Sequence, residues 1–196
     1  MSTASAWSVA LNGIEGAMVE VEVAEGGGLP RTVLVGLPDA ALSQAKERVR
    51  AAVTGAELPW PNGLVTINLS PANLPKTGTH YDLAIATAAL AAIDKVPKEA
   101  ARNHVCLGEL GLDGRLRRVP GILPALLAAV RSGFDKAIVP ASQEAEASLV
   151  PGVTVWAIGH LKDLVAVLNG EPPLGGWEPP GDDDVASRQR PPLDFR

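Results

Sequence analysis

The chain has 196 residues, of which 46% are hydrophobic, 20% charged and 4% aromatic, and its formal net charge is −5. This composition suits one globular domain, or one domain with a tail, whose core is built mainly from aliphatic side chains. The negative charge argues against a strongly basic nucleic-acid binder, and the single cysteine excludes an intrachain disulfide and a multi-cysteine metal site.

The N-terminal stretch MSTASAWSVALNG lacks a basic segment followed by a long apolar core, so we expect no signal peptide. No apolar run reaches the ~18 residues of a membrane-spanning helix. Cys106, in the apolar run HVCLGEL, is expected to be an inert buried thiol on a strand, and a lone cysteine suits a reducing compartment. The sequence therefore predicts a cytoplasmic protein without a membrane partner.

The chain is predicted to open as a meander of strands. In residues 17–30, valines alternate with glutamates (VEVEV), which indicates a half-buried strand with one wet face. Its neighbours are strands predicted at residues 8–13, 31–38 and 63–70.

Two helices are predicted in the first half of the chain. Residues 39–58 should form one amphipathic helix with Asp39 as its N-cap. Residues 81–93 (YDLAIATAALAAI) are apolar nearly all round, so we expect a helix buried on every side. The apolar face of the first helix consists of Ala41, Leu42, Ala45, Val49 and Val53.

The second half alternates helices and strands. A hairpin is predicted at residues 104–119, with LDGR as its turn. The helices that follow are predicted at residues 121–133, 142–150 and 160–170, and the strands at 136–140 and 153–158. This order predicts an α/β fold with α+β layers, in which a mixed β-sheet packs against helices.

The composition changes at Glu171. Residues 171–196 hold six of the seventeen prolines, and they carry six acidic and three basic residues. We therefore divide the chain into a domain at residues 1–170 and a disordered Pro/Gly/Asp-rich linker at residues 171–196. Because the linker accounts for −3 of the net charge of −5, the domain is nearly neutral and has room for a local basic patch.

The stretch NLPKTGTHYDLAIATAAL, residues 73–90, has the residue types of a phosphate-binding or catalytic loop, followed by an apolar helix. A P-loop needs a longer glycine-bounded loop ending in Gly-Lys-Ser/Thr, so that backbone amides surround the phosphate. Here the order differs and the loop is too short. The EGGGLP stretch lacks the strand–turn–helix context that a pyrophosphate site requires. We expect no cofactor in this chain.

A metal site is not expected either. His80, His104 and His160 lie far apart in sequence, without an i+3 or i+4 partner. His80 and Asp82 could share a metal ion, but two ligands make a poor site. His80 is therefore expected to lie in a solvent-facing loop.

Residues 73–140 resemble the proteolytic domain of Lon-type proteases and the related domain of the RadA/Sms recombination ATPases. The matching segments are PKTGTHYDLAIATAAL and VCLGELGLDGRLRRVPGILPALLAAVRSGFDKAIVP, in the same order. In Lon, the loop after the Lys-x-Gly turn carries a nucleophilic serine, and a buried lysine of the later helix is its base. The resemblance places these positions at His80 and Leu123.

Neither residue can take its role in this dyad, because His80 has no hydroxyl and Leu123 cannot accept a proton. The hydroxyls of Ser70 and Thr79 lie nearby in sequence but lack an equivalent base. We therefore expect no enzyme activity from this chain, and Asp82 is expected to cap the helix that begins there. The vestigial active-site loop consists of Lys76, Gly78, His80, Asp82 and Leu123.

The N-terminal half narrows the resemblance. The motifs VGLPDAA, ERVRAA, PWP, TINLSPA and K.G..YDLA resemble the magnesium-chelatase-like ATPases of the ComM/YifB family, over residues 7–169. In that family a Lon-like domain, with a ribosomal-protein-S5-domain-2-like fold, precedes an AAA+ ATPase domain for which ATP and Mg²⁺ are expected. The parent proteins form hexameric rings, and the family includes DNA helicases that promote branch migration in recombination and natural transformation.

The resemblance implies that this chain is the non-catalytic N-terminal domain of such a helicase, acting in DNA guidance or ring assembly. Its partners would be its own AAA+ domain, neighbouring subunits and single-stranded or branched DNA. No Walker motif is present in the chain. The cations that we assign to DNA phosphate are Lys76, Arg115, Arg117 and Arg118, with Lys46, Arg48 and Arg50 of the first helix.

Two alternatives stay open. The first is a protein–protein scaffold without DNA contact. In it, Trp60 of the rigid LPWPN stretch is either an interface anchor or a loop residue that caps the core. The second is a vestigial Lon-like peptidase, which a peptidase assay insensitive to His80→Ala would argue against.

Overall fold

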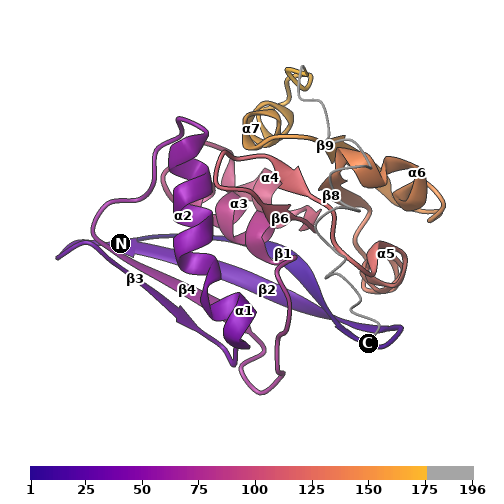
Figure 1. Cartoon of the computed structure of the whole chain (residues 1–196), viewed down its shortest axis with the longest axis horizontal. Coiled ribbons are helices and arrows are strands. Elements are labelled where there is room, and N and C mark those ends of the chain that lie inside the picture. Colours follow the sequence, from indigo (N-terminus) through magenta and orange to yellow (C-terminus); the bar gives the residue numbers. More distant parts are fainter. Residues whose placement is uncertain (176–196) are drawn as a thin grey trace, which may run out of the picture.

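The computed structural model describes residues 1–175, and a seven-stranded sheet in the order β3-β4-β2-β1-β5-β8-β9 forms its centre (Figure 1). β1 pairs antiparallel with β2, and β2 with β4, whereas the other neighbours run parallel. The predicted α/β fold with a mixed sheet is therefore confirmed. The strands of this sheet are β1 (Ser2–Asn12), β2 (Glu15–Gly26), β3 (Arg31–Val35), β4 (Leu64–Ser70), β5 (Val105–Cys106), β8 (Lys136–Pro140) and β9 (Thr154–Ile158).

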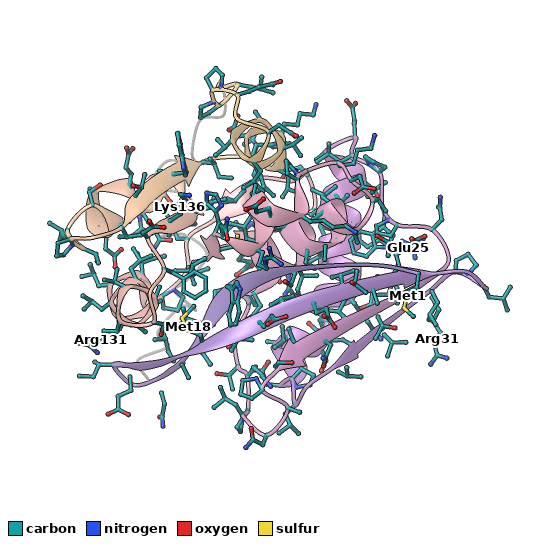
Figure 2. All side chains as sticks on the ribbon, turned by 180° about the vertical axis from the view of Figure 1, so that it is seen from behind. Met1, Met18, Glu25, Arg31, Arg131 and Lys136 are labelled. Atoms are coloured by element: carbon teal, nitrogen blue, oxygen red, sulfur yellow. The ribbon has the colours of Figure 1, made fainter. Side chains whose placement is uncertain are left out.

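The helices form layers on the sheet. α2 and α3 lie over one side of the β1–β4 strands, and α5, α6 and α7 surround the strands of the second half (Figure 1). From behind, strands lie in the foreground, with α5 near Met18 and Arg131 at one end (Figure 2). The helices are α1 (Ala40–Ser43), α2 (Ala45–Gly55), α3 (Asp82–Ala92), α4 (Lys98–Arg102), α5 (Ile122–Arg131), a 3₁₀ turn (Ala141–Gln143), α6 (Glu144–Ala147) and α7 (Leu161–Leu168).

The sheet separates two apolar clusters. The larger lies under α2 and α3 and includes Val21 of β2 and Ile67 of β4. The smaller lies under α5 and includes Val9 and Leu126. The valines of the VEVEV stretch are all buried while Glu22 is exposed, so the predicted strand alternation is confirmed.

Every residue of α3 is buried, as its apolar sequence predicts. The predicted single helix at residues 39–58 is instead broken at Gln44 into α1 and α2. Asp39 is the N-cap of α1, where its side chain accepts a hydrogen bond from the Leu42 N–H group at 2.7 Å. Leu42, Ala45, Val49 and Val53 are buried as expected, and Ala41 is only half-buried.

The predicted hairpin at residues 104–119 is split between two sheets. β5 joins the main sheet, and only β6 (Glu109–Leu110) and β7 (Leu116–Arg117) pair as a hairpin. The chain leaves the main sheet at Gly108. The Gly108 N–H group donates to the His80 carbonyl, and the Gly108 carbonyl accepts from the Leu83 N–H group, both at 3.1 Å. The segment before β6 therefore closes the N-terminus of α3. The short helix α4 has too few residues to show a period, and the sequence did not predict it.

The predicted linker begins with residues that belong to the fold. The N–H group of Leu174 donates to Asp163 of α7 at 2.8 Å, and residues 176–196 lie outside the described part of the chain. Within residues 1–175, no helix has both the length and the apolar character needed to cross a membrane.

Candidate functional site

Lys76 lies inside the loop region that the sequence identified, and its side chain is completely buried. Its ammonium donates to the carbonyl groups of Gly36, at 2.6 Å, and Leu69, at 3.2 Å. A third donation goes to the carbonyl of Pro71. Burial lowers the pKa of Lys76. The structure thus separates Lys76 from the exposed cations with which it was grouped.

The loop is fixed to the segment after β3. The Lys76 N–H group donates to the Leu37 carbonyl at 3.1 Å, and the Asp39 N–H group donates to the Lys76 carbonyl at 2.9 Å. The Asp39 carboxylate also accepts from the Gly78 N–H group at 3.2 Å. Gly36 is required here, because it has φ 113° and an added Cβ would lie 2.2 Å from the Leu69 carbonyl oxygen.

Asp82 and Arg48 form a bidentate ion pair between α3 and α2. Arg48 Nε lies 2.6 Å from Asp82 Oδ2, and Arg48 Nη2 lies 2.7 Å from Asp82 Oδ1. Oδ2 also accepts from the Leu110 N–H group at 3.1 Å. The predicted cap role is wrong, because Tyr81 is the N-cap residue and the Asp82 carboxylate binds groups outside the helix. Arg48 is therefore occupied by a structural contact.

The carboxyl of Asp82 is fully buried. Burial raises the pKa of Asp82, and the hydrogen bonds from Arg48 and Leu110 oppose that rise. The charged form of Asp82 therefore depends on Arg48 more than an exposed carboxylate would.

His80, the residue at the serine position, is buried rather than solvent-facing. Its Nε2 lies 2.6 Å from the Val9 carbonyl oxygen, to which it donates, and its ring lies 4.0 Å from the Tyr81 ring. Burial lowers the pKa of His80, which favours the neutral imidazole. The prediction of an exposed loop histidine is wrong because β1 passes directly beneath this turn.

Leu123, at the lysine position, lies in the first turn of α5, and its surroundings differ from those of His80. It lines an open, mostly apolar hollow with Ile14 at the tip of the β1–β2 hairpin and with Leu127 of α5. Leu123 cannot accept a proton, and the sequence offers no amine at its position. The two positions of the dyad thus carry an imidazole and an aliphatic side chain in place of a hydroxyl and an amine.

Thr79 has a partner that the sequence did not indicate. Its hydroxyl donates to Glu109 Oε2 at 2.6 Å, and Glu109 Oε1 lies 4.0 Å from Arg117 Nη1. A carboxylate next to an arginine is a weak base for a hydroxyl, so this contact does not make Thr79 a nucleophile. Thr79 and Glu109 are 30 residues apart in sequence, so only the folded structure shows that they are in contact.

Arg115 and Arg117 lie on the β6–β7 hairpin with about half of each side chain exposed, 51% and 54%. Arg115 Nε is 3.4 Å from Asp113 Oδ2, in an exposed pair. Arg118 reaches the 3₁₀ turn, where Nη1 donates to the Ser142 carbonyl at 3.0 Å. On α2, Arg50 is exposed and Lys46 is half-buried. The structure therefore keeps five of the predicted cations at or near the surface.

The remaining histidines have structural contacts. His104 is buried and its Nδ1 lies 2.6 Å from the Ala100 carbonyl oxygen. His160 caps α7, where its Nδ1 accepts from the Lys162 N–H group and its Nε2 donates to the Asp113 carbonyl at 2.9 Å. Among residues 1–175, no three His, Cys, Asp or Glu side chains are grouped as metal ligands.

Cys106 is buried on β5, and burial raises the pKa of its thiol to about 12. This is the inert strand thiol that the sequence predicts. Trp60 packs partly buried against the larger core cluster, which favours its reading as a residue that caps the core.

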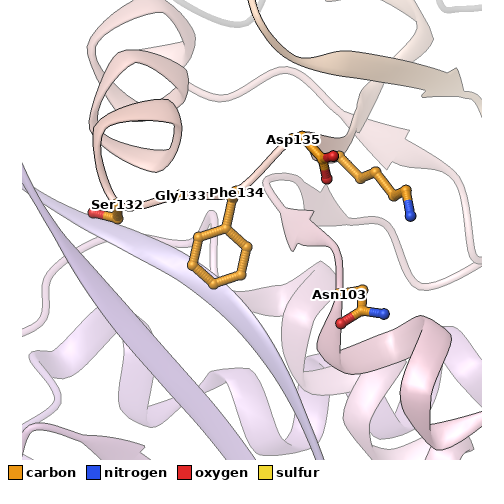
Figure 3. Close-up of a pocket in the computed structure, with 6 residues that line it drawn as sticks. Asn103, Ser132, Gly133, Phe134 and Asp135 are labelled. Carbon is orange, nitrogen blue, oxygen red and sulfur yellow. The ribbon is translucent and has the colours of Figure 1, made fainter.

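A second open hollow lies between α4 and the segment after α5 (Figure 3). Phe134 lies between its polar residues, and the Phe134 ring packs against Trp7 with centroids 5.3 Å apart. The polar residues around it are Asn103, Ser132, Asp135 and Lys136. None of the residues predicted for function lines this hollow.

Comparisons with known proteins identify the family to which the chain belongs. Residues 19–143 match the model described as subunit ChlI of Mg-chelatase. The chain is 49% identical to the uncharacterized protein Rv2897c of Mycobacterium tuberculosis over 90% of its length, which is 35% of that protein. It is 39% identical to the competence protein ComM of Haemophilus influenzae over 89% of its length, which is 34% of ComM.

Two shorter similarities each cover about half of the chain. The chain is 36% identical over 44% of its length to the DNA repair protein RadA of Aquifex aeolicus, covering 18% of that protein. It is 29% identical over 53% of its length to Lon protease 2 of Bacillus subtilis, again covering 18%. The chain spans about a third of the length of the first relatives that it matches.

Proposed function

Since the chain belongs to the family described as subunit ChlI of Mg-chelatase and is similar to ComM, we propose that it is a non-catalytic domain of a DNA-processing ATPase. In this proposal the domain guides DNA, and the β6–β7 hairpin contacts phosphate. The ATPase and helicase activities of the longer protein are part of the same proposal. The names of ComM and RadA, a competence protein and a DNA repair protein, support it.

The observation that carries the proposal is the exposure of Arg115 and Arg117, two positions apart on one hairpin. Arginine binds phosphate bidentately and without reading base sequence, which suits a protein that handles any DNA. Both arginines have a neighbouring carboxylate: Asp113 lies 3.4 Å from Arg115 in an exposed pair, and the half-buried Glu109 lies 4.0 Å from Arg117. Such pairs contribute only about 0–1 kcal/mol, so a phosphate can replace the carboxylate.

The test is fluorescence anisotropy of labelled single-stranded and forked DNA, titrated with the chain at several salt concentrations. We expect the double variant Arg115→Ala, Arg117→Ala to bind more weakly and to lose about 0.7 of salt slope per phosphate contact on a single strand. The matched control is Arg102→Ala, Arg131→Ala, which removes two exposed arginines from α4 and α5. Equal behaviour of the two double variants would exclude the hairpin as the DNA contact.

A scaffold function is the second candidate, and the free edge of the sheet favours it. β3 is an outermost strand, and Val35 and the following Leu37 are exposed, 42% and 54%. Leu37 also has a positive φ of 56°, which is unusual for a leucine and costs free energy. Sedimentation velocity of the chain and of Val35→Lys tests this function. A concentration-dependent association that the lysine abolishes would support it, and a monomer at all concentrations would exclude self-association.

A further inference from the structure

Three asparagines of the chain are followed directly by a glycine, and the structure holds the three pairs differently. They are Asn12, Asn62 and Asn169. In an Asn-Gly pair the glycine has no side chain to obstruct its backbone nitrogen, so this nitrogen can attack the side-chain carbonyl carbon of the asparagine. The attack closes a five-membered succinimide ring and releases ammonia, and water then opens the ring to aspartate or isoaspartate.

Asn169 is held at both reacting groups. Its side-chain amide donates to the carbonyl of Lys95, at 3.1 Å, and to that of Val165, at 2.8 Å. The N–H group of Gly170, whose nitrogen would attack, donates to the Val167 carbonyl at 3.0 Å. Ring closure at Asn169 would break all of these hydrogen bonds, so the folded chain protects this pair.

Asn12 is held by the backbone of the β1–β2 hairpin. It is the last residue of β1 and pairs with Glu15 across the turn. A strand residue has an extended backbone, and closure of the succinimide ring requires a rotation of ψ out of the extended range. Although Asn12 is exposed, cyclisation there would open the end of the hairpin.

Asn62 has neither kind of protection. It is exposed and lies between α2 and β4, outside any helix or strand. Within residues 1–175, the Asn62 side chain has no hydrogen-bond partner and the Gly63 N–H group has no acceptor. The two groups that react are therefore both unrestrained by hydrogen bonds.

Gly63 lies where three strands meet. Its carbonyl accepts from the Arg31 N–H group, at the start of β3, at 3.1 Å. The next residue, Leu64, pairs with Gly26 of β2 and with Arg31. A Cβ added to Gly63 would lie 2.4 Å from the Gly26 carbonyl oxygen, so the backbone is tightly packed here. Isoaspartate at position 62 adds one carbon to the backbone directly before this junction, which would displace Gly63 from Arg31.

We propose that Asn62 is a modification site at which the folded chain deamidates without an enzyme, and that isoaspartate there loosens the free edge of the sheet at β3. The Gly63 nitrogen bonds to Asn62 Cγ, and its proton leaves with the amide nitrogen as ammonia. One water molecule then cleaves an imide C–N bond. Cleavage at Cγ gives aspartate, and cleavage at the backbone carbonyl of residue 62 gives isoaspartate. This proposal is independent of DNA binding.

The direct test is mass spectrometry of tryptic peptides from the folded chain, incubated in a mildly alkaline buffer that favours the deprotonated glycine nitrogen. The three Asn-Gly pairs fall into different peptides, residues 1–31, 51–76 and 163–188. Fragmentation of each peptide assigns the modified position. The control is Asn62→Gln, whose longer side chain closes a ring much more slowly and should remove the product from the second peptide.

We expect acid to replace the amide at Asn62 first, mostly as isoaspartate. In the urea-unfolded chain the three pairs should react at similar rates, because their different protection comes from the fold. A folded chain in which Asn12 or Asn169 reacts as fast as Asn62 would overturn the proposal, and so would an Asn62 that stays unmodified while the unfolded chain reacts.

The effect on β3 is measured by hydrogen exchange of the Arg31 amide. The control is Asn62→Asp, which adds the same charge without lengthening the backbone. We expect the Arg31 N–H group to exchange about fivefold faster in the isoaspartate form than in the control, because it loses one hydrogen bond. Equal exchange in the two proteins would refute the loosening of the edge, while the peptide analysis decides the modification itself.

Discussion

The cations of this domain occupy two regions that look alike in sequence and differ completely in structure. In the region of the β4–α3 loop, Lys76 is buried on backbone carbonyls and Arg48 is paired with a buried carboxylate. On the β6–β7 hairpin, Arg115 and Arg117 are half exposed, with carboxylate partners at 3.4 and 4.0 Å. The difference shows that a cation has a structural role when buried carbonyl or carboxylate groups accept its hydrogen bonds. A position close to a glycine turn in the sequence does not by itself indicate whether a cation is exposed.

The largest effect expected from this contrast is that of Arg48→Met. It leaves the Asp82 carboxylate buried without its partner, and breaking a buried pair in this way costs about 3–5 kcal/mol in the free energy of unfolding. The control is Arg50→Met on the same helix. Because Arg50 is exposed, this variant should change the free energy of unfolding by no more than about 0.5 kcal/mol. Urea unfolding of both variants measures the difference, and similar costs would remove the distinction between the two regions.

The pH dependence of Arg48→Met sharpens the same point. Burial raises the pKa of Asp82 in the folded state, and loss of Arg48 removes the strongest opposing contact. A carboxyl whose folded pKa is raised binds its proton more tightly when folded, so stability falls as pH rises from the unfolded pKa through the folded one. The cost of Arg48→Met should therefore be smaller near pH 4 than at pH 7. Urea unfolding at several pH values between 4 and 7 measures this cost. A cost that stays constant over this range would contradict the raised pKa of Asp82.

Lys76→Met should have the next largest effect. The variant keeps the length of the side chain but leaves three backbone carbonyls without their donor, at a cost of about 2–3 kcal/mol. Lys136→Met, at an exposed position on β8, is the matched control and should be nearly neutral. Thermal or urea unfolding measures both, and a neutral Lys76→Met would mean that water replaces the ammonium.

Glu109→Gln tests the residue that joins the two regions. Glu109 contacts Thr79 on one side and Arg117 on the other, and the amide keeps an acceptor for the Thr79 hydroxyl. We expect a loss of about 1 kcal/mol or less in the free energy of unfolding. DNA affinity, measured by anisotropy, should rise because Arg117 loses its carboxylate neighbour. A fall in affinity would indicate that Glu109 orients Arg117 for binding.

The smallest expected effect on stability is that of Arg115→Ala, Arg117→Ala. Exposed ion pairs contribute about 0–1 kcal/mol, so the double variant should unfold within about 1 kcal/mol of the unaltered chain. This result would separate a loss of DNA binding from a loss of folding. A cost comparable with that of Arg48→Met would assign the hairpin arginines a structural role.

Much of the fold could be predicted from sequence, because period and turn chemistry are local. The alternation of β2 and the apolar α3 both led to correct elements. The break at Gln44 and the division of residues 104–119 between two sheets depend on packing between distant segments, which local patterns do not encode. The helix α4 was missed because five residues are too few to show a period.

The candidate site was less predictable for the same reason. The sequence identified the loop that contains Lys76, His80 and Asp82, but their burial results from β1 and the β6 segment passing close to it. The partner of Asp82 is 34 residues earlier in the chain, and that of Thr79 is 30 residues later. Such pairs follow from topology, and a single sequence gives no measure of them.

The central strand β1 has a consequence for the dynamics of the domain. It is paired along its whole length with β2 and also contacts β5, and its residues contribute to both apolar clusters, Ala6 to one and Val9 to the other. Because neither cluster can open without breaking this strand, the backbone amides of β1 should be among the last to exchange with deuterium. Their exchange rates would then report the opening of the whole domain, while α4 and the free edge at β3 exchange through local fluctuations.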